Sequence, residues 1–161
     1  MAIPDFVASL RAQIGTAPLW LSGVTAVVVK DDQLLLVQRA DTGAWTPVTG
    51  IIDPGEQPAD AGVREVAEEA GVRVVPERLA GIGVTDMVVY PNGDESQYLD
   101  LTFLMRWVAG DPHPADGENT RAEWFPLDAL PDMSAEMTGR IEAALSDGAG
   151  ARFRFDGQLH G

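Results

Sequence analysis

Three glutamates, Glu65, Glu68 and Glu69, lie close together in a segment that the sequence predicts to be helical. The helix is expected to begin near Pro58 and to end at Gly71, because proline is favoured just inside a helix start and glycine just past a helix end. At about 100° per residue, the three carboxylates share one face of the helix. Oxygen ligands spaced in this way suit hard divalent cations such as Mg²⁺ or Mn²⁺, which also bind substrate phosphates.

The apolar residues of this helix are expected to form a buried stripe on the opposite side: Val63, Val66, Ala67 and Ala70. Carboxylates three and four residues apart repel each other by roughly a few tenths of a kcal/mol per pair, and only Arg64 is near enough to offset them. A solvated acidic face is the ordinary explanation of an isolated Glu-x-x-Glu-Glu pattern. The surrounding residues decide between that explanation and a metal site.

From Gly50 to Val72 the chain reads GIIDPGEQPADAGVREVAEEAGV. This segment resembles the signature of the Nudix hydrolase family, which includes the MutT-like proteins: G-x5-E-x7-R-E-U-x-E-E-x-G-U, where U is aliphatic. Every fixed position is matched, by Gly50, Glu56, Arg64, Glu65, Val66, Glu68, Glu69, Gly71 and Val72. Most of these positions demand a single residue type, so a chance match is on the order of one in a billion per start position.

The resemblance implies that Glu65 and Glu69 are metal ligands. Glu68 would be a ligand directly or through water, and the carbonyl of Gly50 would be a backbone ligand. The implied reaction is hydrolysis of a nucleoside diphosphate linked to another moiety, in which a metal-bound water attacks phosphorus and a carboxylate takes the proton. No covalent intermediate is needed, in agreement with the lack of cysteine and of a G-x-S-x-G elbow.

By the same resemblance, Glu56 and Arg64 form an ion pair that fixes the loop against the helix; a surface pair worth well under about 1 kcal/mol is the other interpretation. Glu118, six residues before Trp124, fits the position of a further acidic ligand or base, but it could equally be solvated in an acidic loop. Arg39 resembles an arginine that contacts substrate phosphate in MutT-like members, and a surface salt bridge is the alternative.

Two aromatic residues are candidates for substrate binding. Trp45 lies five residues before Gly50, where the family often has an aromatic; core packing is favoured over base stacking. Tyr90 lies eighteen residues beyond Val72, a spacing that suggests base stacking, although turn chemistry explains it equally well. The substrate stays open among nucleoside triphosphates, ADP-ribose-like sugars and dinucleoside polyphosphates.

These residues need a scaffold of strands and helices. A strand hairpin is expected at 23–30 and 33–39, with a turn at Asp31-Asp32. Further strands are expected at 72–75, 80–88, 98–108 and 122–125, a second helix at 133–145, an amphipathic helix within 1–15 and a surface loop at 110–119. The fold class is α/β, and the resemblance implies a Nudix α/β/α sandwich with a mixed β-sheet. Arg152 to Phe155 could be an edge strand or an oligomer contact.

The chain has 161 residues, no cysteine and a net charge of −14. One domain is expected over residues 1–161, with a helical extension at 1–20, the motif at 50–72 and a tail at 146–161. Scattered basic residues exclude a general nucleic-acid binder, and the longest apolar run is too short to span a membrane. By elimination, and without a secretory signal, a cytoplasmic location follows. We expect a small-molecule nucleotide substrate, and a homodimer is compatible with the sequence.

Two other functions remain open. The first is a Nudix-like domain that binds a nucleotide without cleaving it, which loss of the motif glutamates would favour. The second is an acidic interaction protein whose glutamates serve only solubility, which would show no dependence on divalent ions. All three glutamates are present, and hydrolysis is therefore the function that we expect.

Overall fold

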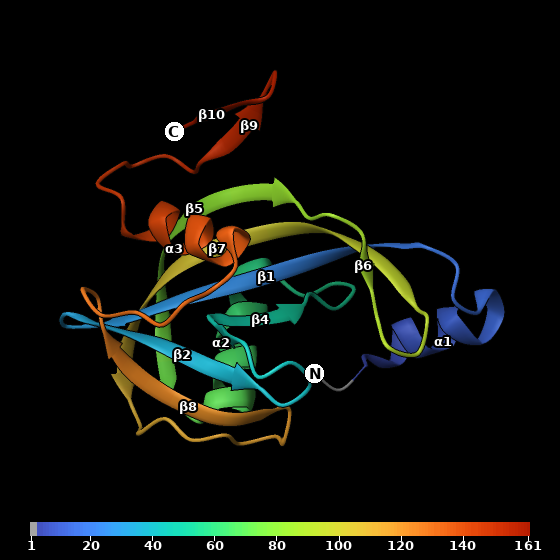
Figure 1. Cartoon of the computed structure of the whole chain (residues 1–161), viewed down its shortest axis with the longest axis horizontal. Coiled ribbons are helices and arrows are strands. Elements are labelled where there is room, and N and C mark those ends of the chain that lie inside the picture. Colours follow the sequence, from blue (N-terminus) through green and yellow to red (C-terminus); the bar gives the residue numbers. More distant parts are fainter. Residues whose placement is uncertain (1–2) are drawn as a thin grey trace.

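The computed structural model describes residues 3–161, and a mixed β-sheet lies between helices as expected (Figure 1). The strands are β1 (Leu19–Lys30), β2 (Gln33–Arg39), β3 (Trp45–Thr46), β4 (Val48–Ile51), β5 (Arg73–Val84), β6 (Val88–Val89), β7 (Glu95–Ala109), β8 (Asn119–Pro126), β9 (Phe153–Phe155) and β10 (Gln158–His160). The helices are α1 (Asp5–Ile14), α2 (Pro58–Ala70) and α3 (Ala135–Leu145). The order of the main sheet is β3-β2-β1-β7-β5, and β4, β6 and β8 pair with β1, β7 and β2.

The central strand β1 organises the sheet. It runs parallel to β7 over eleven residue pairs, and it meets β2 only at the hairpin, where Val29 pairs with Leu34 and Lys30 with Gln33. The predicted hairpin is confirmed, and Asp31 takes the left-handed conformation (φ 51°) that aspartate tolerates in tight turns. Further along, β2 pairs with β8 and β1 pairs with β4. The sheet therefore opens between β1 and β2, and β4 leads into the glutamate-bearing segment at this opening.

Apolar side chains fill both faces of the sheet. The cluster on the α2 face includes Ala26, Val28, Leu35, Val37, Val48, Val66, Ala70 and Met105. The cluster on the α3 face includes Val27, Leu34, Leu36, Ala80, Ile141 and Ala144. Because successive residues of β1 and β2 alternate between the two clusters, both strands read as continuous apolar runs in the sequence.

Helix α2 has the predicted ends, and Val63, Val66 and Ala70 of the predicted apolar stripe lie in or against the core, but the buried face also includes two glutamates. Pro58 occupies its first turn, and Gly71 ends it in the left-handed conformation (φ 68°) with its N–H bonded to the carbonyl of Ala67. Ala67 is exposed, contrary to expectation, whereas Glu65 and Glu69 are each only 5% exposed. These two glutamates are buried because β4 and the loop before β8 cover their side of the helix, and the periodicity of α2 alone does not reveal this cover.

Several boundaries also differ from the sequence prediction. The two strands expected at 72–75 and 80–88 form one strand, β5, whose pairing with β7 is interrupted by register shifts near Pro76 and Gly81. These bulges let the strand continue past a proline. Asn119 is buried and begins β8, so the preceding loop ends one residue earlier than predicted.

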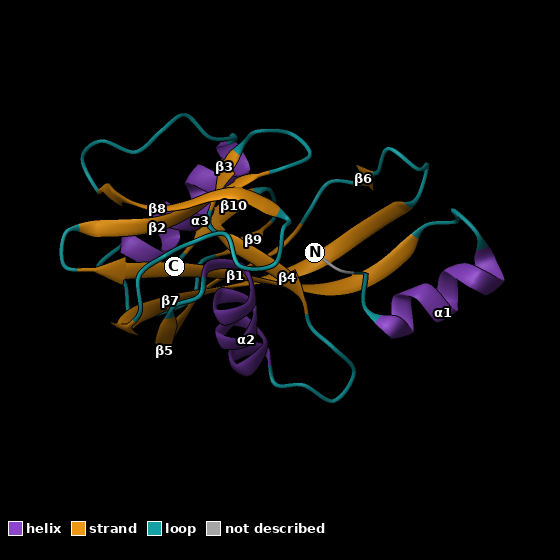
Figure 2. Ribbon diagram, turned by 90° about the horizontal axis from the view of Figure 1, so that it is seen from below, coloured by secondary structure: helices purple, strands orange, loops and turns teal. Residues whose placement is uncertain are grey.

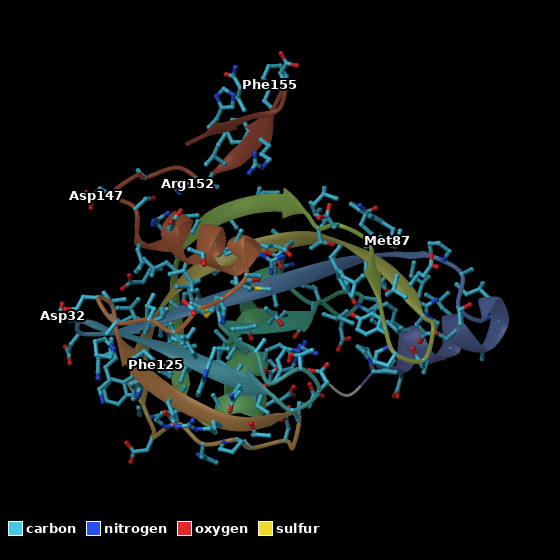
Figure 3. The ribbon with its side chains drawn as sticks, viewed as in Figure 1. Asp32, Met87, Phe125, Asp147, Arg152 and Phe155 are labelled. Carbon is cyan, nitrogen blue, oxygen red and sulfur yellow. The ribbon has the colours of Figure 1, made fainter. Side chains whose placement is uncertain are left out.

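The two terminal segments lie apart: α1 is at the right-hand end of the molecule in Figure 1, and the C-terminal hairpin projects at the top, above α3. The expected N-terminal helix is α1, and the part of the expectation that falls on Met1 and Ala2 lies outside the described residues. In the tail, β9 pairs with β10 in a separate hairpin, and Arg152 bridges to Gly81 of β5. Phe155 lies on this hairpin, away from the sheet (Figure 3). Among residues 3–161, no helix is long and apolar enough to cross a membrane.

Candidate active site

The close contact between Gly50 and Glu65 joins β4 to α2. A Cβ atom on residue 50 would lie 2.1 Å from the carboxyl carbon of Glu65, so only glycine leaves room for this carboxylate. Burial raises the pKa of Glu65, while the neighbouring Arg64 guanidinium opposes that rise. A buried carboxylate is therefore held directly beside the end of β4.

Arg64 ties the loop ahead of α2 to the helix. Its Nε and Nη2 donate to the two carboxylate oxygens of Glu56 at 2.8 and 2.9 Å, and Nη2 also donates to the carbonyl of Ile51 at 3.1 Å. Its Nη1 donates to Glu65 at 2.9 Å and to the exposed Glu68 at 3.1 Å. The pKa of Glu56 is lowered by these bonds to Arg64. One guanidinium thus fixes the loop and orients two helix carboxylates.

A second acidic group forms around Glu69. The carboxylates of Glu69, Asp116 and Glu118 each offer an oxygen within 4.8 Å of the others, and Asn119 donates to Glu69 at 2.9 Å. Burial raises the pKa of Glu69 to about 7. A divalent cation bound there would compete with a proton for the carboxylate.

The loop that carries Asp116 and Glu118 is fastened to the end of α2. The backbone N–H of His113 donates to the carbonyl of Ala70 at 3.1 Å, and that of Ala115 donates to the carbonyl of Glu69 at 3.2 Å. The ring of His113 lies against Gly71, where a Cβ would be 2.1 Å from its Cε1 atom. These contacts use carbonyls that the helix end leaves unpaired, and they bring the loop acids to Glu69.

Two hollows meet at Glu118. The smaller, of about 220 Å³, is lined by Val37, Arg39, Ala40, Asp41, Thr46, Thr49, Glu69, Glu118 and Asn119. The larger, of about 440 Å³, is lined by Ile3, Pro4, Asp5, Asp53, Arg64, Glu65, Glu68, Asp116 and Glu118. Because Glu118 lines both, the two hollows adjoin: Glu65 and Glu68 of the motif border the larger one, and Glu69 borders the smaller one.

The remaining candidates differ in position. Arg39 pairs with Asp41 at 2.9 and 2.6 Å, as the salt-bridge interpretation expects. It also lines the smaller hollow, and its contact with substrate phosphate stays a prediction. Trp45 packs edge to face on Phe125, with ring centroids 4.8 Å apart. The hydroxyl of Tyr90 is bonded to that of Tyr98 at 2.6 Å, and burial raises its pKa. In the described part of the chain, neither Trp45 nor Tyr90 lines either hollow.

The sequence did not single out Asp116, Asn119 or the segment Ile3–Asp5 as parts of the site. Asp116 lies two residues before Glu118 in an acidic loop, and this proximity was the only indication in the sequence that Asp116 belongs to the site. Asn119 is buried, but nothing in the neighbouring sequence distinguishes it from the exposed residues of the loop. The place of Ile3–Asp5 depends on how α1 packs, which has no local signature.

The fold and site define an α/β/α protein with a carboxylate-lined cleft beside a loop-helix-loop. Comparison with protein families matches residues 20–144 to the NUDIX domain, and the chain belongs to this family. It is thus a Nudix hydrolase, as the motif predicted. A MutT-like protein of Streptomyces ambofaciens is 34% identical over 85% of this chain and 84% of its own length.

Other relatives share only part of their length with the chain. The NAD-capped RNA hydrolase NudC of Pseudomonas aeruginosa is 34% identical over 70% of this chain, but the match spans only 38% of NudC. Among solved structures, an ADP-ribose pyrophosphatase of Streptococcus suis has a TM-score of 0.63 and 28% identity, covering 83% of this chain and 98% of that one. A MutT protein of Methanosarcina mazei, at 21% identity and a TM-score of 0.65, shares the fold.

Proposed function

We propose that this protein is a Mg²⁺- or Mn²⁺-dependent pyrophosphohydrolase that cleaves a nucleoside diphosphate linked to another moiety. The observation that carries this proposal is the gathering of buried and loop carboxylates at one cleft: Glu65 beside Gly50, and Glu69 with Asp116 and Glu118. Substrate pyrophosphate is itself anionic. Such a cleft can accept it only together with cations.

The residues present fit a hard divalent cation. Six carboxylates and one guanidinium line the larger hollow, and that guanidinium, on Arg64, is already paired with Glu56. Carboxylate and carbonyl oxygens are the ligands that Mg²⁺ and Mn²⁺ prefer. Glu65, Glu69 and Glu118 would hold the metal with the carbonyl of Gly50, and Glu68 would bind directly or through water. When bound, the metal would lower the pKa of a coordinated water and offset phosphate charge.

The chain's own groups would orient the reactants. Arg64 holds Glu65 by a 2.9 Å hydrogen bond, and Asn119 holds Glu69, so these two carboxylates would keep their positions as substrate charge changes. Arg39 lies on the wall of the adjoining hollow, where its guanidinium could bind a non-bridging phosphate oxygen after exchanging from Asp41. One of the acidic side chains would accept the proton of the attacking water.

The substrate proposal is a small nucleotide derivative: a nucleoside triphosphate, an ADP-ribose-like sugar nucleotide or a dinucleoside polyphosphate. The similarity to an ADP-ribose pyrophosphatase and to NudC supports a nucleoside diphosphate with a second attached group. We propose Trp45 and Tyr90 as supports of the substrate-binding region rather than direct contacts, since Trp45 packs on Phe125 and the Tyr90 hydroxyl is bonded to that of Tyr98.

A substrate panel tests the function. The purified protein should hydrolyse at least one compound among ATP, ADP-ribose, diadenosine tetraphosphate and NADH when Mg²⁺ or Mn²⁺ is present, and chelation with EDTA should abolish turnover. Product identification by chromatography would show which anhydride bond breaks. Nucleotide binding without turnover would instead support a regulatory domain, and indifference to both nucleotide and metal would support an acidic interaction protein.

A further inference from the structure

Helix α1 lies ahead of the region that matches the NUDIX domain, yet it is firmly attached to that region. Val7 is only 6% exposed and packs with Leu21 of β1 and Ile51 of β4. Ile51 directly follows Gly50, so the apolar contact of α1 is made beside the backbone that approaches Glu65. The first half of α1 is therefore positioned relative to the candidate metal site.

Arg11 fastens the second half of α1. Its guanidinium donates to the carbonyl of Gly15 at 3.1 Å, and to the carbonyl and hydroxyl oxygens of Glu95 and Ser96 at 2.6 and 3.1 Å. It also pairs with Asp94 at 3.6 Å, and its side chain is only 11% exposed. The helix is thus tied to the start of β7, and Figure 2 shows it beside the ends of β1 and β7. Because α1 is held at two points, the residues at and just before its start, Ile3 to Asp5, have a fixed position relative to the sheet.

Those leading residues reach the larger hollow. Ile3, Pro4 and Asp5 line it together with Glu65, Glu68 and Glu118. Of the nine residues around this hollow, seven are charged, and the two apolar ones are Ile3 and Pro4. Ile3 lines this hollow and is 58% exposed, so it adds accessible apolar surface to a lining that is otherwise mostly charged.

We propose that Ile3 and Pro4 form a substrate-selecting wall of the active site, which contacts the uncharged part of the bound nucleotide, a base or a sugar. This inference rests on the proposed function. The acidic residues, with their cations, would bind the phosphates, and they offer no favourable surface to a ring. Nucleotide pockets combine a few polar contacts with apolar surface that packs on the ring, and here the residues just before α1 supply that surface.

The phosphates and the ring of the nucleotide are expected to bind to different residues, and inorganic pyrophosphate allows phosphate binding to be measured without the ring. Ile3→Ser should raise the KM of the accepted nucleotide at least about fivefold, leave kcat within about twofold, and leave the inhibition constant of Mg²⁺-pyrophosphate within about twofold. Pyrophosphate carries the anhydride but no ring. A change confined to the nucleotide therefore reports contact with the ring and not damage to the metal site.

Two variants control the experiment. Ile3→Leu keeps the apolar surface and should keep the wild-type KM. Ile14→Ser makes the same exchange at the last residue of α1, where Ile14 is 41% exposed and lines neither hollow, and should change neither the nucleotide KM nor the pyrophosphate inhibition constant. Thermal unfolding of each variant shows that the fold is retained.

An unchanged nucleotide KM in Ile3→Ser would refute the proposed contact between Ile3 and the nucleotide ring, while leaving the hydrolase proposal intact. An equal rise in the pyrophosphate inhibition constant would also overturn it, because the effect would then concern phosphate or metal binding. Failure of the wild type to hydrolyse any nucleotide of the panel would refute the proposed function itself. The two failures are therefore distinguishable.

Discussion

Glu69 carries the largest expected effect of any single side chain, because it is buried beside Asp116 and Glu118. Glu69→Gln keeps the shape and the possible bond with Asn119 but removes a ligand charge. We expect kcat to fall at least about a hundredfold at saturating Mg²⁺, which corresponds to about 2.7 kcal/mol of lost transition-state stabilisation. Steady-state kinetics measure this loss. The exposed Glu142 of α3 gives the control, and Glu142→Gln should retain full activity.

Gly50 is expected to tolerate no side chain. In Gly50→Ala, the new Cβ would meet the carboxyl carbon of Glu65 at 2.1 Å, so either that carboxylate or β4 must move. Overpacking of this kind costs about 1–3 kcal/mol of unfolding free energy. Chemical denaturation and kinetics should show reduced stability and greatly reduced turnover.

Gly83→Ala is the matched control for that change. Gly83 lies in β5, and a Cβ there would have no atom within 4 Å. The substitution should leave both stability and activity close to wild type. Equal effects of the two substitutions would show that the close approach of Gly50 to Glu65 has no special role.

Among the secondary-structure elements, α3 is joined to the sheet by a buried ion pair that the sequence did not reveal. Arg140 lies 3.2 Å from Asp100 of β7 and donates to the Thr25 hydroxyl at 2.8 Å. Thr102 also donates to Asp100. Burial raises the pKa of Asp100, although the charge of Arg140 opposes the rise. The pair positions α3 but lies outside both hollows in the described part of the chain.

Arg140→Met should destabilise the fold by about 3 kcal/mol at neutral pH, because it leaves the Asp100 charge buried without its partner. The pKa of Asp100 in the folded variant should rise further above its unfolded value. Stability relative to wild type should therefore be greatest at low pH and fall as the pH rises through the folded pKa. Urea denaturation between pH 4 and 8 measures this.

The double variant Arg140→Met/Asp100→Asn supplies the control for this prediction. It removes the buried charge together with its partner. It should therefore recover much of the lost stability, and the added pH dependence of stability should disappear. A single variant whose stability is unaffected by pH would contradict the role given to this pair.

Local sequence signals were sufficient to predict where α2 begins and ends and where the first hairpin turns. Pro58, Gly71 and the Asp31 turn each act through backbone conformation, which depends on neighbouring residues. The burial of Glu65 and Glu69 could not be predicted in this way. The buried edge of α2 is set by Gly50, which lies fifteen residues before Glu65, and by Asn119, which lies fifty residues after Glu69.

In the candidate site, too, contacts within one segment of the chain could be predicted and contacts between distant segments could not. The motif residues Glu56, Arg64 and Glu65 are brought together by the α2 segment and its preceding loop, so their spacing was informative. Asp116 joins Glu69 only because the loop before β8 bonds to the end of α2. The wall formed by Ile3 depends on the packing of α1. Contacts of this kind arise from tertiary structure and leave no periodic pattern in the chain.

For the whole molecule, with its net charge of −14, a divalent cation bound at the proposed site would stabilise the fold as well as serve the reaction. A cation that binds only the folded state adds about 2.7 kcal/mol at a concentration one hundred times its Kd. Mg²⁺ or Mn²⁺ should therefore raise the Tm of the wild type in a concentration-dependent way. The rise should be less than half as large in Glu69→Gln.

Sodium chloride at matched ionic strength controls for general screening of the negative charge. It should raise the Tm of the wild type and of Glu69→Gln equally. If the divalent salts give no more than this common rise, cations screen the surface and bind no specific site.

Diffraction from crystals grown with Mn²⁺ and a non-hydrolysable nucleoside diphosphate analogue would locate the metal by its anomalous scattering, without reference to activity. We expect an anomalous peak bound by the carboxylates of Glu69 and Glu118, near Gly50 and Glu65, and in contact with the phosphates of the analogue. Glutamates turned toward bulk solvent, with no anomalous peak between them, would contradict this expectation.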